Sequence, residues 1–258
     1  MRFLSTCLFL VTLEGATGPA KGHLVIAGGG KLGPEIVDRF IALAGGPEAS
    51  IVIIPTADDR DEFPADYAAT SFLAKAGAKH VTTLHTRNKA DSDTEAFAAV
   101  IRKASGVWFT GGRHWRLVDS YLGTKVHREL MALLDRGGVI GGTSAGATIQ
   151  GSFMVRGARS GNTTMIDKEY QQGLGFLQGV AIDQHLLTRK REKDMLPVVE
   201  LHPELIGLGL DEGTAIVVTG DRFEVVGVSK VAIYEHGKTY YFLSAGERFD
   251  IGRRVKAE

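Results

Sequence analysis

The sequence predicts an α/β fold: a mostly parallel, doubly wound sheet with helices on both faces, followed by antiparallel strands near the C-terminus. Two observations support this prediction. Through about the first 140 residues, short apolar segments alternate with helix-length segments, which is typical of a parallel sheet covered on both faces. From about Leu205 the apolar segments become short and tight turns separate them, which is typical of antiparallel strands.

The individual elements follow from periodicity and from turn residues. The first strand is predicted at His23–Ala27, and Pro34 opens the first helix. The predicted helices cover residues 34–44, 66–76, 94–104 and 125–136. The other predicted strands cover residues 50–54, 80–84, 107–109, 139–140, 180–184, 215–219, 222–226, 231–234 and 240–243.

Length and charge limit the organisation of the chain and its partners. The 258 residues, 44% hydrophobic, contain no Pro/Ser-rich linker or internal repeat, so residues 21–258 are predicted to form a single domain. Thirty basic and thirty acidic residues give a formal charge of zero. We therefore expect no nucleic-acid partner and no membrane partner that depends on overall charge.

Residues 1–20 resemble a secretory signal peptide. A positive start at Met1-Arg2 precedes apolar residues 3–13, and small residues follow at positions 16–20. The apolar stretch is too short to span a membrane, so the protein is expected to be secreted or periplasmic. The lone cysteine, Cys7, lies inside this segment, so the mature chain would have no thiol, disulfide or cysteine ligand. We expect no metal and no cofactor.

Three glycine-rich segments follow predicted strands, where ligands bind in open parallel sheets. One of them, Gly28–Gly33, matches the dinucleotide pattern G-x-G-x-x-G between a strand and a helix. Two features argue against a nucleotide. Asp58, the candidate ribose-binding acid, lies several residues beyond the end of the second predicted strand, and Pro34 directly follows the third glycine, where the helix of this motif should have begun. A nucleotide-binding protein that uses this loop remains an alternative interpretation.

The segment Gly142-Thr143-Ser144-Ala145-Gly146 matches G-x-S-x-G and stands between a predicted strand and a helix. This context predicts a nucleophile elbow, in which Ser144 adopts a strained backbone and small neighbours avoid clashes. The alternative is a glycine-rich loop whose serine only caps the helix.

A serine nucleophile needs a base, and the base needs a third group that orients it. Among eight histidines, His185 is the candidate base because it directly follows the strand that ends at Gln184. Asp211 and Glu212 follow another strand end, and either could orient the imidazole. Because side chains alternate along a strand, only one of the two should face His185.

Five segments in this order resemble cyanophycinases and their relatives in the aspartyl dipeptidase (peptidase E) family of serine peptidases. The similarity covers nearly the whole mature chain. The segments are Phe109–Gly112, Gly142–Ala147, Gly173–Val180, Ile182–His185 and Gly207–Ala215.

The resemblance implies a fold related to class I glutamine amidotransferases and a triad of Ser144, His185 and Glu212, with Asp211 facing away. Elbow geometry and the resemblance together predict that the N–H groups of Ala145 and Gly112 form the oxyanion hole.

The resemblance also implies a peptide substrate, either cyanophycin, from which β-aspartyl-arginine would be released, or an aspartyl or isoaspartyl dipeptide. Such a zwitterionic substrate needs cations for its carboxylates and anions for its guanidinium. The candidates for substrate binding are Arg113, Arg116, Asp183, Gln184, Arg189, Arg191 and Glu169. The chain departs from the family at His114, since glutamine is common there. The oligomeric state stays open between a monomer and a homodimer.

Overall fold

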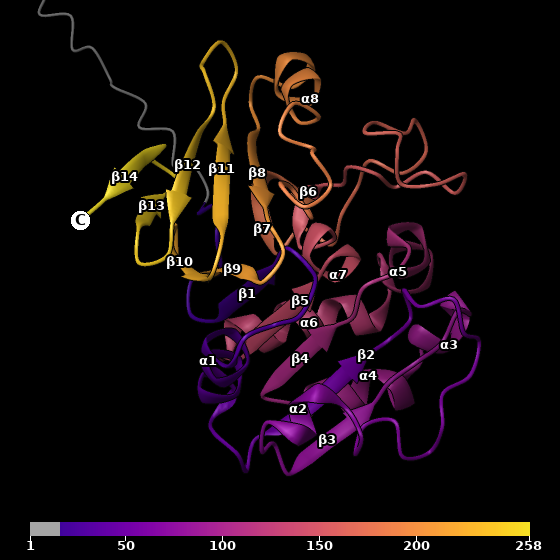
Figure 1. Ribbon diagram of the computed structural model, residues 1–258. Helices are drawn as coiled ribbons and strands as arrows, with labels where there is room; N and C mark the ends of the chain where they lie inside the picture. Colours follow the sequence, from indigo (N-terminus) through magenta and orange to yellow (C-terminus); the bar gives the residue numbers. More distant parts are fainter. Residues whose placement is uncertain (1–15) are drawn as a thin grey trace, which may run out of the picture.

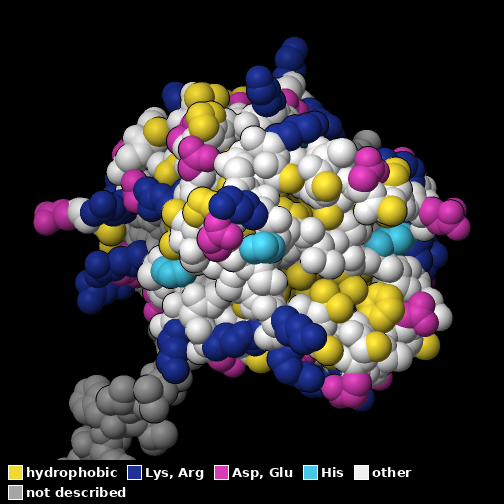
Figure 2. Space-filling view, turned by 90° about the horizontal axis from the view of Figure 1, so that it is seen from below, with side chains coloured by type: hydrophobic (Ala, Val, Ile, Leu, Met, Phe, Trp, Pro, Cys, Tyr) yellow, Lys and Arg dark blue, Asp and Glu magenta, His cyan; other side chains and the backbone are white. Residues whose placement is uncertain are grey.

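The computed structural model describes residues 16–258. Residues 1–15, which make up most of the predicted signal peptide, lie outside the described part of the chain. Within residues 16–258, no helix has both the length and the apolar character needed to cross a membrane. On the face shown in Figure 2, basic and acidic side chains are interspersed, as the balanced composition leads one to expect.

A nine-stranded sheet forms the larger part of the molecule (Figure 1). Five parallel strands make up one half of this sheet, in the spatial order β1 (His23–Ala27), β5 (Val139–Thr143), β4 (Gly106–Phe109), β2 (Ser50–Ile54) and β3 (His80–Thr83). Four antiparallel strands extend it beyond β1, in the order β9 (Thr214–Thr219), β10 (Arg222–Gly227), β13 (Arg248–Asp250) and β14 (Val255–Ala257). The predicted mixture of parallel and antiparallel strands is confirmed.

A second sheet of five strands stands beside the first (Figure 1). Its order is β12 (Tyr241–Ser244), β11 (Lys230–Tyr234), β8 (Ile206–Leu210), β7 (Leu177–Gln184) and β6 (Gly151–Phe153). Within this sheet, β8 pairs in parallel with β7 and antiparallel with β11. The parallel pairing follows from the connection between β7 and β8, a crossover through α8 (Leu196–Leu201), which returns the chain to the same end of the sheet.

Helices and the second sheet cover the two faces of the large sheet. On one face, α1 (Pro34–Ala44) and α2 (Phe72–Lys75) pack on alternate residues of β1 and β2. On the other face, one continuous core joins the remaining residues of these strands to α4 (Glu95–Arg102) and α6 (Lys125–Asp135) and to the inner face of the second sheet. The remaining helices are α3 (Lys89–Ser92), α5 (His114–Tyr121) and α7 (Ala145–Thr148).

The helix predicted over residues 66–76 is shorter than expected. Ser71 has an extended backbone, and its hydroxyl accepts the N–H of Ala74 at 3.3 Å, so the α-helix begins only at Phe72. The residues before Ser71 form turns.

The two sheets meet where the carboxyl ends of three strands converge. Ser144 follows β5 of the large sheet, whereas His185 follows β7 and Glu212 lies just beyond β8 of the small sheet. The three predicted catalytic residues therefore lie at the junction between the two sheets.

Candidate active site

Ser144 stands on a sharp turn between β5 and α7. Its backbone has φ 54° and ψ −115°, a conformation that non-glycine residues rarely adopt. The neighbouring glycines are sterically required: a Cβ on Gly142 would lie 2.1 Å from the carbonyl oxygen of Gly146. The Ser144 side chain makes no capping hydrogen bond to α7, so the alternative in which it serves only as a helix cap was wrong.

His185 lies between Ser144 and Glu212. Its Nε2 is 2.9 Å from Oγ of Ser144, and its Nδ1 is 2.5 Å from Oε1 of Glu212. Because a carboxylate only accepts hydrogen bonds, Nδ1 carries the proton of the neutral imidazole and Nε2 is free to accept from the serine hydroxyl. His185 also has a positive φ of 55°, and its backbone N–H donates to the backbone carbonyl of Gly28 at 2.9 Å.

Asp211 points away from the imidazole and holds the chain that follows it. Its Oδ1 accepts the backbone N–H groups of Leu187 and Thr188 at 3.0 and 2.9 Å, and its Oδ2 accepts the hydroxyl of Ser229 at 2.7 Å. Burial raises the pKa of Asp211, but these hydrogen bonds outweigh burial and lower it overall. Asp211 is therefore an ionised anchor for the loop that follows His185.

The glycine-rich loop after β1 packs against two of these side chains. A Cβ on Gly29 would lie 2.3 Å from Cε1 of His185, and one on Gly30 would lie 2.6 Å from Oε2 of Glu212. Both glycines have positive φ. Contact with the imidazole and the carboxylate accounts for these two glycines of the G-x-G-x-x-G pattern without a nucleotide.

The two backbone segments predicted to form the oxyanion hole lie next to Ser144 in the chain or against its side chain. Ala145 is the first residue of α7, so its N–H has no acceptor within the helix. Gly111 lies against the nucleophile, since a Cβ there would be 3.6 Å from Oγ of Ser144. Gly112 has φ 139°, and a Cβ there would clash with the carbonyl of Ala57 at 2.0 Å, so this turn accepts only glycine.

The electrostatic surroundings lower the pKa of His185 below its ordinary value of 6.5. Burial is the main cause, the hydrogen bond to Glu212 opposes it, and the positive charge of Arg189 adds to the lowering. The imidazole is therefore neutral at pH 7, which is the form that can accept a proton.

Arg156 is a buried residue that the sequence did not single out. Its guanidinium binds both carboxylate oxygens of Asp183, at 2.7 and 2.8 Å, and also binds Asp194 at 2.7 Å and the carbonyl of Asn162. Asp183 is fully buried, and its Oδ1 also accepts the N–H of Gln184. The carboxylate of Asp183 is thus engaged by the protein itself, two residues before His185.

Gln184, Arg191 and His114 form a second buried group next to this ion pair. Nη1 of Arg191 donates to the carbonyl and to Oε1 of Gln184, at 3.1 and 3.3 Å. The amide nitrogen of Gln184 lies 3.4 Å from Nε2 of His114. Burial, with the charges of Arg156 and Arg191 as smaller causes, lowers the pKa of His114 to about 3, so its ring is neutral at pH 7.

The remaining candidates for substrate binding differ in position. Arg189 is exposed on the loop after His185, close enough to influence its pKa, and Arg113 is half-buried directly before α5. Arg116 donates to the carbonyl of Asp58 at 2.5 Å and pairs with Asp59 at 2.7 Å, so it holds a neighbouring loop. Glu169 is exposed and lines a small cavity beside α5.

No group of three or more histidine, cysteine, aspartate or glutamate side chains within residues 16–258 is arranged to hold a metal ion. What the site does contain is an elbow serine, a neutral imidazole within hydrogen-bond distance of it, and a carboxylate on the far ring nitrogen. This arrangement on an α/β scaffold defines the class of serine hydrolases.

The chain belongs to peptidase family S51, whose family model matches residues 24–226. It is 33% identical over 208 residues to a cyanophycinase of Geminocystis herdmanii, covering 79% of this chain and 75% of the relative. It is 30% identical over 249 residues to a cyanophycinase of Trichormus variabilis, covering 86% and 82% of the two chains. The predicted family and the prediction of a hydrolase are confirmed.

Two solved structures share the fold. A peptidase from an acI-B1 Actinobacterium superposes with a TM-score of 0.68 at 23% identity, covering 91% of this chain and 98% of the other. A putative peptidase E protein from Listeria monocytogenes gives a TM-score of 0.57 at 17% identity, with 81% and 100% covered.

Proposed function

We propose that this serine peptidase hydrolyses the peptide bonds of cyanophycin and releases β-aspartyl-arginine, with Ser144 as nucleophile, His185 as base and Glu212 as orienting acid. The hydrogen-bond chain from Oγ of Ser144 through the imidazole to Oε1 of Glu212 is the observation that carries this proposal. The cyanophycinases that resemble the chain over most of its length support the choice of substrate.

The proposed reaction has two halves. Oγ of Ser144 attacks the scissile carbonyl while Nε2 of His185 takes its proton, and the N–H groups of Ala145 and Gly112 stabilise the oxyanion. The imidazolium then protonates the leaving amine, and an acyl-enzyme forms on Ser144. In the second half, His185 takes a proton from water, the hydroxide attacks the ester, and the acid product leaves as Oγ regains its proton.

Recognition in this proposal depends on which charged side chains are free. Arg189 is exposed beside His185, and Arg113 is half-buried directly before α5; we assign both to the carboxylates of the substrate. Asp183 and Arg191 are buried and bound to neighbouring residues, so we assign them a supporting role: they shape the wall of the site. Gln184 belongs to the same wall.

The test is to incubate the purified protein and its Ser144→Ala variant with cyanophycin and with α- and β-aspartyl dipeptides, and to identify products by mass. We expect β-aspartyl-arginine from cyanophycin, and a loss of about 10⁴ to 10⁶ in turnover in the variant. Cleavage of the dipeptides but not of the polymer would favour the dipeptidase function instead. Unchanged activity in the variant would contradict the assigned nucleophile.

A further inference from the structure

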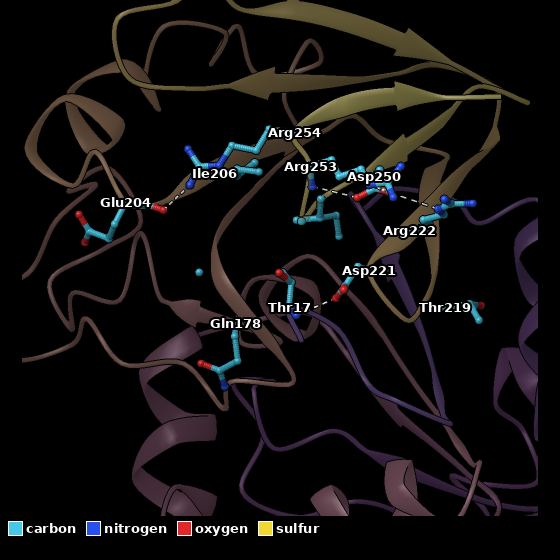
Figure 3. A pocket seen from close by; sticks show the side chains of 13 residues that line it. Thr17, Gln178, Glu204, Ile206, Thr219, Asp221, Arg222, Asp250, Arg253 and Arg254 are labelled. Atoms are coloured by element: carbon cyan, nitrogen blue, oxygen red, sulfur yellow. Dashed lines mark hydrogen bonds and ion pairs between the residues drawn. The ribbon is translucent and has the colours of Figure 1, made fainter. Parts of the chain in front are cut away.

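A cavity of about 730 Å³ lies at the end of the small sheet opposite to the triad (Figure 3). Gln178 and Ile206, which line it, stand near the beginnings of β7 and β8, whereas His185 and Glu212 follow the ends of the same strands. Its charged lining residues are Arg222, Arg253, Arg254, Glu204, Asp221 and Asp250.

Two of the three carboxylates in this cavity already accept hydrogen bonds from other residues of the protein. Oδ1 of Asp221 accepts the N–H groups of Thr17 and Gly18 at 2.7 and 3.1 Å. Oδ2 of Asp250 accepts Nε of Arg222 at 3.2 Å. These contacts fix the walls of the cavity, and they leave the charges of other side chains available to a ligand.

The available charges are positive. Arg253 is 77% exposed, and the contact of its side chain with Asp250, at 3.9 Å, is too long for a hydrogen bond. Arg254 uses one nitrogen to bind the carbonyl of Glu204, which leaves its other N–H groups for a ligand. The carboxylate of Glu204 is 67% exposed, lies 3.4 Å from Nδ1 of His202 and points away from the other lining side chains (Figure 3). A ligand that carries a carboxylate would satisfy this lining.

We propose that this cavity is a second binding site for the polymer, which holds an arginyl branch far from the bond that is cut. The proposal rests on the proposed function, because each branch of cyanophycin carries one α-carboxylate and one guanidinium. Arg253 and Arg254 pair with the carboxylate. The peptidase would therefore hold a long chain at two points.

The distance between the two sites sets a minimum chain length. From Gln178 to His185 the chain advances seven residues, mostly as strand β7, or about 23 Å at roughly 3.3 Å per residue. An extended aspartyl backbone covers a similar distance per residue, so a substrate needs at least about seven units to reach both sites. Two-point attachment raises the effective concentration of a long polymer at the triad and leaves the chemistry of a short one unchanged.

Binding can be measured without cleavage in the Ser144→Ala protein. We expect the added substitutions Arg253→Ala and Arg254→Ala to weaken binding of cyanophycin of several dozen units by about tenfold, since they remove two charged contacts. Arg248→Ala is the matched control, because Arg248 is exposed on the neighbouring strand and does not line the cavity.

In the active enzyme, the same double substitution should raise KM for the long polymer about tenfold, leave kcat unchanged, and leave both constants unchanged for a four-unit oligomer. The proposal would be overturned if the double variant bound cyanophycin as tightly as the Arg248→Ala control does. It would also be overturned if the double substitution raised KM for the four-unit oligomer as much as for the long polymer. If the parent cleaves no cyanophycin of any length, the proposed function fails, while the binding measurement still decides whether the cavity holds the polymer.

Discussion

Gly29 lies so close to His185 that a Cβ at its position would be 2.3 Å from Cε1 of the imidazole. Gly29→Ala should therefore displace the ring and lower kcat/KM by about 10²-fold or more, as a shift near 1 Å of a catalytic group does. Gly46→Ala is a suitable control: Gly46 also has a positive φ, but nothing lies within 4 Å of the added Cβ. If both variants lose the same activity at equal thermal stability, the contact with His185 is not the cause.

The two adjacent carboxylates should respond differently to loss of charge. Glu212→Gln should lower kcat by about 10³-fold or more, because the amide no longer stabilises the imidazolium that forms during the reaction. Asp211→Asn should affect kcat much less, since Oδ1 of the amide still accepts the N–H groups of Leu187 and Thr188. Steady-state kinetics of both variants is the measurement, and the opposite order would assign the orienting role to Asp211.

The pH profile should report the environment of His185. Because the base must be neutral, activity is lost as the pH falls through its pKa, and burial places the midpoint of this acid limb of kcat/KM below pH 6.5. Arg189→Ala removes a positive charge that lowers this pKa, so the limb should move to higher pH. Arg248→Ala, which lies on another part of the surface, should leave the profile in place. A shift of the midpoint to lower pH in the Arg189→Ala variant would contradict the placement of the Arg189 charge near His185.

His114 should make the folded protein sensitive to acid. Its pKa is about 3 in the folded state and near 6.5 when unfolded, so the unfolded chain binds more protons between these values. The stability contributed by the buried neutral ring is complete above pH 6.5 and is lost as the pH falls towards 3, by up to about 5 kcal/mol. His114→Gln should flatten this dependence in urea unfolding measured from pH 7 to pH 4. An unchanged slope would show that His114 is not the titrating group.

We propose that a signal peptide is removed on export and that the mature chain begins at or before Thr17, a few residues ahead of Lys21. The N–H groups of Thr17 and Gly18 bind Asp221, and the carbonyl of Thr17 accepts the N–H of Gln178 at 2.7 Å. A cut at Lys21 would remove these hydrogen bonds, each worth about 1 kcal/mol. Intact mass of the protein recovered outside the cytoplasm is the measurement. Full-length protein confined to the cytosol would contradict export, and a start at Lys21 would contradict the role of these contacts.

The sequence indicates some parts of this site much better than others. The elbow at Ser144 could be predicted because its glycines, its strand and its helix are all local. The alternation that separates Asp211 from Glu212 is local as well, although the sequence alone did not show which of them faces His185. The parallel pairing of β8 with β7 and the contact of Gly29 with His185 arise from tertiary packing, which periodicity does not reveal.

Arg156 is the clearest example of a residue whose role could not be predicted from the sequence. It lies 27 residues from Asp183 and 38 residues from Asp194, in a loop without a regular pattern. A buried arginine has no signature in a single sequence, because arginines are common at the surface and their partners are distant in the chain. Only the tertiary fold brings the guanidinium of Arg156 between the carboxylates of Asp183 and Asp194.

The division of the triad between two sheets makes catalysis dependent on how the sheets are docked. Ser144 is fixed to the large sheet, whereas His185 and Glu212 are fixed to the small one, so a slide of 1 Å between the sheets would break the hydrogen bond between Oγ and Nε2 while leaving every strand intact. Partial unfolding that loosens this junction would abolish turnover before backbone hydrogen bonds are lost. Activity is thus a local probe of tertiary docking, and on heating it should disappear before circular dichroism reports any loss of helix or strand.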